Sequence, residues 1–340
     1  MANICILGGG SWGMALSVLL SNNGHKVSVW SAVPAELDYM KEHGEHKMLP
    51  GVKLPDSISY IYDDKEAVTD RDLLVMAVAS SYVRSTAKRL SSLIKNGQRI
   101  VDVAKGVEEN TLMTMSQIIE EEIPIADVAV LSGPTHAEEV IRGLPTTIVV
   151  GAKSKETAEY IQNLFMSEVF RVYTSPDILG MELGGALKNV VALAAGMADG
   201  LGYGDNTKAA LITRGITEIS RLGVKMGAHF ETFVGLTGIG DLIVTCASMH
   251  SRNRRAGILI GQGKTYKEAM DEVQMVVEGV YSAKAALGLA KKYDVQLPII
   301  EQVNEILFEG KNPGDAVKEL MLRDKKLEVT GLSDEFSDWK

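Results

Sequence analysis

The chain contains little cysteine. Cys5 and Cys246 are the only cysteines among 340 residues, which is too few for a disulfide framework and predicts a reducing compartment. Cys5 lies within a short apolar run, so we interpret it as a small buried apolar residue rather than a nucleophile.

Positive charge and long apolar runs are also in short supply. The 35 Lys and Arg residues face 44 Asp and Glu residues, and the net charge of −9 disfavours general binding to nucleic acids or anionic membranes. No uninterrupted apolar run has transmembrane length, and the chain starts on a strand pattern without a basic leader or cleavage signal. We therefore expect a cytoplasmic protein without membrane insertion or a nucleic-acid partner. An anionic ligand would need a local cluster of cations.

Two kinds of pattern divide the chain near residue 175. Before this point, short β-rich runs alternate with helical stretches, and after Ser175-Pro176-Asp177 the patterns are almost exclusively helical. This arrangement predicts an α/β fold: an N-terminal Rossmann-type, doubly wound parallel sheet in residues 1–175, followed by an all-helical C-terminal domain in residues 176–340. The predicted strands are 3–7, 26–30, 73–78, 99–103, 128–131, 146–150 and 169–173, and the predicted helices of the second half are 177–199, 206–223, 251–261, 265–271, 280–292, 298–308 and 312–321.

Some helix ends have local signals. Asp205 or Asn206 can cap the helix predicted from 206, and Pro298 suits the first turn of the helix that it opens. The last ten residues are rich in Asp, Glu and Ser and are expected to fray.

The first predicted strand runs into a glycine-rich turn. Gly8, Gly10 and Gly13 stand at the G-x-G-x-x-G positions, between that strand and an apolar helix pattern. In a dinucleotide site such glycines allow a tight turn, a close approach of the backbone to the pyrophosphate, and close packing of helix on strand. A purely structural turn is the alternative, but the surrounding strand–turn–helix–strand order favours a dinucleotide site.

Lys188 lies in the middle of a helix pattern made of small and apolar residues. Its neighbours one helical turn away are glycine, valine and alanine, so no carboxylate of its own helix can pair with it. Such a lysine either reaches along the helix to water or is held for chemistry, because a buried lysine has a depressed pKa.

Three polar segments are expected to meet at the carboxyl edge of the sheet, where ligands bind in doubly wound folds. Ala104-Lys105-Gly106 and Ser132-Gly133-Pro134-Thr135-His136 each follow a predicted strand. The third segment comes from the helical half: a glycine-rich turn from Gly235 that carries Asp241, and then Ser251-Arg252-Asn253-Arg254-Arg255. The arginines are typical of an anion site, and the alternative is a solvated basic helix start.

Together these motifs resemble a known family. They are Gly8-Gly-Gly-Ser-Trp-Gly13, Ala104-Lys-Gly106, Ser132-Gly-Pro-Thr-His-Ala137, Glu182-Leu-Gly-Gly-Ala-Leu-Lys-Asn189, Gly238-Ile-Gly-Asp241 with Ser251-Arg-Asn253, and Val276-Val-Glu278-Gly-Val280. In order and spacing the chain resembles, over nearly its whole length, the soluble bacterial NAD(P)-dependent sn-glycerol-3-phosphate dehydrogenases. The resemblance implies reversible reduction of dihydroxyacetone phosphate to sn-glycerol 3-phosphate for phospholipid synthesis, with NAD or NADP as cofactor and no metal.

The resemblance also implies roles for individual residues. Lys188 matches the catalytic proton donor and acceptor, with Lys105 and Asp241 beside it, while Asn189 and Thr245 have supporting roles. The implied substrate contacts are Lys105, Gly133, Thr135, Lys188, Asp241, Ser251, Arg252 and Asn253. The implied cofactor contacts are Ser11, Trp12, Lys105, Ala137, Arg252, Val276 and Glu278, together with the turn glycines Gly8, Gly10 and Gly13.

One departure concerns the choice of coenzyme. After the second strand the chain reads Trp30-Ser-Ala-Val-Pro34, where the family often carries histidine or arginine. An acid at this place would favour NAD and an arginine would accommodate the 2′-phosphate of NADP. Ser31 can hydrogen-bond either form, so the sequence leaves the preference open.

Other readings stay open at this stage. A related two-domain dehydrogenase for 3-hydroxyacids or sugar acids also uses a lysine–asparagine pair on a helix, and substrate trials separate it from the phosphate enzyme. A dinucleotide sensor without turnover is a different class, but it has no need of Lys188, Lys105 and Asp241 together. An apolar helix face in the second half is either core or the interface of a homodimer.

Overall fold

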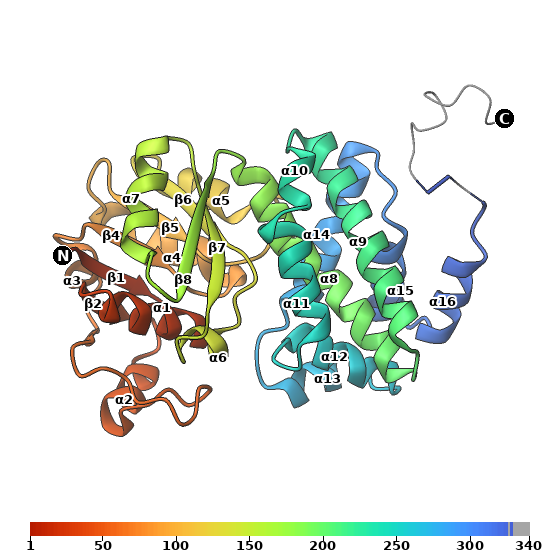
Figure 1. The fold of residues 1–340 in the computed structure, drawn as a ribbon, viewed down its shortest axis with the longest axis horizontal. Coiled ribbons are helices and arrows are strands. Elements are labelled where there is room, and N and C mark those ends of the chain that lie inside the picture. Colours follow the sequence, from red (N-terminus) through yellow and green to blue (C-terminus); the bar gives the residue numbers. More distant parts are fainter. Residues whose placement is uncertain (326, 329–340) are drawn as a thin grey trace.

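The computed structural model describes residues 1–325, 327 and 328, and these form two parts (Figure 1). The N-terminal part is a sheet covered by helices, and the C-terminal part is built of helices. The fraying expected for the last ten residues lies outside the described residues.

The N-terminal part contains an eight-stranded sheet in the order β3-β2-β1-β4-β5-β6-β7-β8. The first six strands are mutually parallel, with the order change at β1 that marks a doubly wound Rossmann sheet. The strands are β1 Asn3–Leu7, β2 Lys26–Trp30, β3 Ser59–Ile61, β4 Leu73–Met76, β5 Arg99–Asp102, β6 Asp127–Ser132, β7 Thr146–Ala152 and β8 Phe170–Ser175.

Two features of the sheet differ from the prediction. Strand β7 is antiparallel to β6, so the sheet is mainly rather than wholly parallel. A run of apolar residues indicates that a strand is buried but does not show in which direction it runs. The connection between β6 and β7 contains only the four-residue helix α6 (Ala137–Val140), so β7 starts at the same edge of the sheet at which β6 ends. Strand β3 was missed because three residues are too few to show a pattern.

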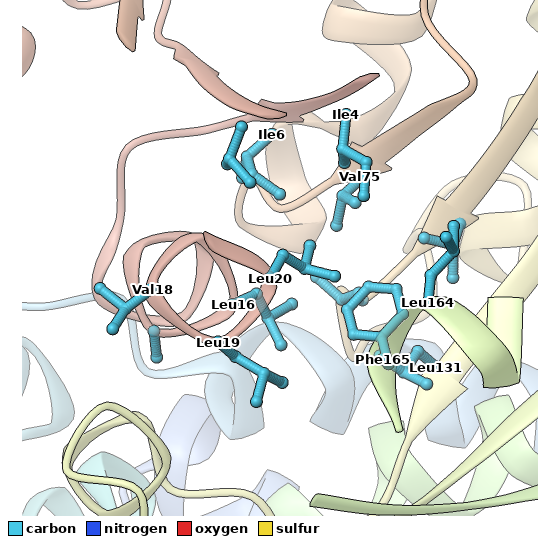
Figure 2. Close-up of a cluster of buried hydrophobic side chains, with 14 of the residues drawn as sticks. Ile4, Ile6, Leu16, Val18, Leu19, Leu20, Val75, Leu131, Leu164 and Phe165 are labelled. Carbon is cyan, nitrogen blue, oxygen red and sulfur yellow. The ribbon is translucent and has the colours of Figure 1, made fainter. Parts of the chain in front are cut away.

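Successive strand residues point to opposite faces of the sheet, and each face has its own core. Ile4 and Ile6 pack under helix α1 (Ser11–Asn22), where Figure 2 shows them near Leu16 and Leu20. Cys5 faces the other layer and is fully buried, which confirms its interpretation as a core residue; burial raises the pKa of its thiol to about 12. The other helical elements of this part are α2 Pro34–His43, α3 Asp64–Val68, η1 Ser80–Tyr82, α4 Val83–Leu90, η2 Ser91–Leu93, α5 Met115–Glu122 and α7 Lys155–Phe165.

The C-terminal part is arranged around helix α8 (Ile178–Gly200), which packs against α9, α11, α12 and α14. By length and composition α8 and the stretch 230–247 could each cross a membrane, but 89% of the α8 window is buried inside the protein. The remaining elements are α9 Asp205–Met226, α10 Phe230–Phe233, η3 Leu236–Gly240, α11 Asp241–Ala247, α12 Arg252–Gly261, α13 Tyr266–Val273, α14 Glu278–Tyr293, α15 Pro298–Glu309 and α16 Pro313–Met321.

The helical half corrects two local predictions. The segment from Gly235 to Asp241 is not a simple turn: a π-helical turn, η3, leads directly into α11, so Asp241 begins a helix. Close packing requires glycine at position 238, since a methyl group there would overlap the carbonyl of Phe233. Helix α9 is capped by Gly204 rather than by Asp205 or Asn206, whereas Pro298 does occupy the first turn of α15.

Helices α8 and α12 touch along a seam of glycines, formed by Gly196 and Gly200 on α8 and by Gly257 and Gly261 on α12. A methyl group on Gly196 would overlap the carbonyl oxygen of Arg254, and one on Gly257 would overlap that of Leu193. The two backbones therefore lie closer than any larger side chain permits.

This seam predicts that Gly196→Ala lowers the free energy of unfolding by about 1–3 kcal/mol, because the added methyl overpacks a rigid backbone contact. Urea unfolding followed by circular dichroism measures the change. Gly204→Ser is the control, since a side chain there meets open space. Equal stability of the two variants would contradict a rigid seam.

Candidate active site

The glycine turn after β1 has the shape that a dinucleotide needs. Gly8 has a φ of 126°, and a methyl group on it would lie 2.7 Å from the backbone of Ala77. In contrast, a methyl group on Gly10 would meet no atom of the described residues within 4 Å, so that side of the turn is open. No side chain caps the N-terminus of α1, and the buried indole N–H of Trp12 has no partner in the described chain. Free N–H groups beside an open turn fit a pyrophosphate.

Lys188 is 5% exposed and is held by α11 rather than by its own helix. Its ammonium group donates to Oδ1 of Asp241 and to Oγ1 of Thr245, each at 2.6 Å. Asp241 and Thr245 stand four residues apart on α11, so both side chains point from one helix face toward α8.

The second oxygen of Asp241 binds the other domain. Lys105, from the loop after β5, donates to Oδ2 of Asp241 at 2.6 Å and to the carbonyl of Gly133 at 2.9 Å. Glycines on α8 allow close packing here, because a methyl on Gly185 would lie 3.0 Å from the Ser132 hydroxyl oxygen and one on Gly184 would lie 2.7 Å from the carbonyl oxygen of Thr237 in η3. The cluster of Lys105, Lys188 and Asp241 thus joins two loops of the sheet edge to two helices.

The electrostatics of this cluster are governed by burial and mutual charge. Burial lowers the pKa of Lys188 to about 8; the Asp241 carboxylate opposes this effect and the Lys105 charge adds to it. Burial raises the pKa of Asp241, but the two ammonium groups outweigh burial and hold that pKa below its usual value. The cluster therefore has a lysine that can gain or lose a proton near neutral pH, beside a carboxylate that stays charged.

The loop after β6 supplies further polar groups. Gly133 has a φ of 155°, and Thr135 donates its hydroxyl to the Gly133 carbonyl at 3.1 Å. Ala137 begins the short helix α6 and is buried. The Nε2 atom of His136 is buried without a partner among the described residues, and burial, followed by the Lys188 charge, lowers the pKa of this imidazole.

The start of α12 places both neutral polar and positively charged side chains at the site. Ser251 caps the helix by accepting the backbone N–H of Arg254, and Asn253 donates to Asn189 and accepts the backbone N–H of Gly279. In the described chain no carboxylate lies within ion-pair distance of Arg252, whereas Arg254 pairs with Asp199. Arg252 is therefore available to an anion at this helix N-terminus, while Arg254 is committed to the fold.

Glu278, the first residue of α14, reaches across to the sheet domain. Its carboxylate accepts the backbone N–H of Ser80 at 3.1 Å and also the Ser80 hydroxyl. Burial raises its pKa, and the bonds from Ser80 oppose this change. Val276 lies just before α14 and is partly buried.

Several polar groups near the site were not predicted from sequence. Glu182 on α8 accepts the backbone N–H and the hydroxyl of Ser116 at 2.8 and 2.6 Å, and Ser80 binds Glu278 as described above. Asp102, at the end of β5, is fully buried with one oxygen unpartnered in the described chain, and burial raises its pKa well above the usual value. Thr245 differs from these groups, because the resemblance had already given it a supporting role.

A Rossmann domain with a phosphate-binding turn, facing a helical domain with a buried lysine–carboxylate pair, defines a two-domain dinucleotide-dependent dehydrogenase. Residues 3–158 and 177–318 match the family descriptions "NAD-dependent glycerol-3-phosphate dehydrogenase N-terminus" and "C-terminus". The chain belongs to the NAD-dependent glycerol-3-phosphate dehydrogenase family, which confirms the resemblance seen in the sequence.

Individual relatives agree over their full lengths. The chain is 64% identical to "Glycerol-3-phosphate dehydrogenase [NAD(P)+]" of Agathobacter rectalis, covering 100% of both chains. It is 62% identical to the protein of the same name from Fusobacterium nucleatum, covering 97% of this chain and 99% of the relative. The crystal structure of glycerol-3-phosphate dehydrogenase from Coxiella burnetii superimposes with a TM-score of 0.91 at 36% identity, covering 95% of this chain and 99% of that one.

Proposed function

We propose that Lys188 is the proton donor and acceptor in the reaction of this family, the NAD(P)-dependent interconversion of dihydroxyacetone phosphate and sn-glycerol 3-phosphate. Reduction adds a hydride to the carbonyl carbon and a proton to the carbonyl oxygen. The bound nicotinamide coenzyme supplies the hydride. Lys188 stabilises the developing negative charge on oxygen and gives up the proton; in the reverse direction its neutral amine takes the hydroxyl proton.

The observation that carries this proposal is the burial of Lys188 against Asp241. A lysine is rarely buried unless a partner or a function requires it. Asp241 orients the ammonium group and opposes its loss of charge, while the Thr245 hydroxyl fixes a second bonding direction. The remaining N–H of Lys188 is left for the substrate oxygen.

We assign the substrate phosphate to the start of α12. Arg252 offers a guanidinium group at a helix N-terminus that Ser251 begins, and Asn253 lies in the first turn. The loop of Gly133 and Thr135, held by Lys105, would complete the substrate site on the sheet side.

The coenzyme is assigned to the open turn. Gly8, Gly10 and Gly13 form the turn, and Ser11 and Trp12 present the free N–H groups of α1. The other proposed coenzyme contacts lie around the junction of the two parts: Lys105, Ala137, Arg252, Val276 and Glu278.

Several wider assignments are proposals of the same kind. We place the domain boundary near residue 175, between the end of β8 and the start of α8. Buried free cysteines and the net negative charge support a cytoplasmic enzyme without membrane insertion or a nucleic-acid partner, acting in phospholipid synthesis. The homodimer stays a prediction.

Replacing Lys188 with Ala is expected to lower kcat by about 100-fold or more, because the proton donor is lost, while coenzyme binding changes little. Steady-state kinetics with dihydroxyacetone phosphate and a coenzyme titration measure the two effects. Lys225→Ala, on the exposed side of α9, is the control. A Lys188→Ala enzyme with near-normal kcat would refute the assignment.

The pKa of about 8 at Lys188 predicts opposite pH profiles for the two directions. Reduction needs the ammonium form, so its kcat/KM should fall about tenfold per pH unit above that pKa. Oxidation needs the neutral amine, so its rate should rise up to pH 8 and then level off. Profiles that run in the same direction would show that another group controls proton transfer.

Arg252→Ala should raise the KM for dihydroxyacetone phosphate by about tenfold to 100-fold, because a charge-assisted contact to the phosphate is lost. The exposed Arg214→Ala serves as the control. An unchanged KM would place the phosphate elsewhere.

A further inference from the structure

The end of β2 lies against the dinucleotide turn. The backbone N–H of Gly8 donates to the carbonyl of Trp30 at 2.8 Å, and Leu7 pairs with Trp30 across the two strands. Ser31, the next residue, is therefore placed beside the turn that receives the coenzyme. In Rossmann domains this is where an acid about 20 residues beyond the turn reads the ribose 2′-hydroxyl.

Ser31 is not itself an acid, but its side chain is hydrogen-bonded to one. Its hydroxyl donates to Oε2 of Glu36 at 2.8 Å and accepts the backbone N–H of Val33 at 3.1 Å. Glu36 lies in the first turn of α2, and a methyl group on Gly9 of the dinucleotide turn would be 3.5 Å from the same carboxylate oxygen. Ser31 is buried and Glu36 is exposed, so the Glu36 carboxylate is held by a buried hydroxyl while the side chain stays accessible to solvent.

Two basic side chains near the dinucleotide turn and the end of β2, His46 and Arg89, are already bound by other groups of the protein. His46 uses both ring nitrogens: Nε2 lies 3.1 Å from the carbonyl of Gly9, and Nδ1 accepts the backbone N–H of Met48. Burial lowers the pKa of His46, so it is neutral at pH 7. Arg89 stacks on Trp30 but is bound by Asp64 through two hydrogen bonds of 2.7 and 2.8 Å.

We propose that Glu36, held by Ser31, supplies from helix α2 the acid that β2 lacks and makes the enzyme prefer NAD(H) to NADP(H). A carboxylate here accepts a hydrogen bond from the ribose 2′-hydroxyl. The same carboxylate repels a 2′-phosphate, since both groups are anionic. The coenzyme preference is thus set by Glu36, which lies five residues beyond Ser31, the usual place of the acid.

Equilibrium titration of the purified enzyme with NADH and with NADPH, followed by nicotinamide fluorescence without substrate, tests the proposal. The native chain should bind NADH more tightly. Glu36→Gln should weaken NADH binding by roughly tenfold, because a bond to a charged acceptor is lost, and should tighten NADPH binding by roughly tenfold, because repulsion is removed.

Two further variants separate charge from position. Ser31→Ala keeps the charge of Glu36 but releases its anchor, so NADH binding should weaken while NADPH binding gains less than in Glu36→Gln. Glu42→Gln removes the same charge from the far end of α2 and should change neither constant.

Equal affinity of the native chain for both coenzymes, or tighter binding of NADPH, would overturn the proposal. So would a Glu36→Gln variant with an unchanged ratio, or a Glu42→Gln variant with the same shift. The inference shares with the proposed function only the dinucleotide site. Failure to turn over dihydroxyacetone phosphate would contradict the function while leaving the ratio of binding constants readable.

Discussion

The structure of the site depends on one buried carboxylate that is shared by two lysines. Asp241 gives one oxygen to Lys188 of the helical part and the other to Lys105 of the sheet part. Two ammonium groups this close would repel each other in a low-dielectric interior, and the carboxylate between them makes the pair tolerable. The same interaction opposes the loss of proton affinity that burial imposes on Lys188, and it links the two parts of the chain.

Two other carboxylates repeat this arrangement across the junction. Glu182 of α8 binds Ser116 of the sheet part, and Glu278 of α14 binds Ser80. Each glutamate accepts hydrogen bonds from the neutral donors of a serine, whereas Asp241 accepts them from ammonium groups. Burial raises the pKa of both glutamates, whereas the two lysines hold the pKa of Asp241 below its usual value, so Asp241 is the carboxylate of the three that most favours its charged form.

Much of the fold could be predicted, because strands such as Leu73–Met76 are continuous apolar runs and α8 has an unbroken helical pattern. The direction of β7 and the π-helical turn before Asp241 could not, since they depend on chain path and on backbone packing. The sequence showed that Lys188 has no carboxylate partner within its own helix, and a motif suggested Asp241 as its partner. The bonds of Glu182, Ser80 and Glu36 join residues far apart or follow from side-chain conformation, which composition and spacing do not encode.

The glycine seam between α8 and α12 limits which substitutions this chain can accept. Gly196 faces Gly257, and each would drive a methyl group into the opposite backbone, so a larger residue on either helix requires both helices to separate. Helix α8 carries Lys188 and α12 begins with Arg252. The spacing of the seam therefore constrains the separation of the proposed proton-transfer group and the proposed phosphate-binding group, and with it the length of substrate that would fit between them.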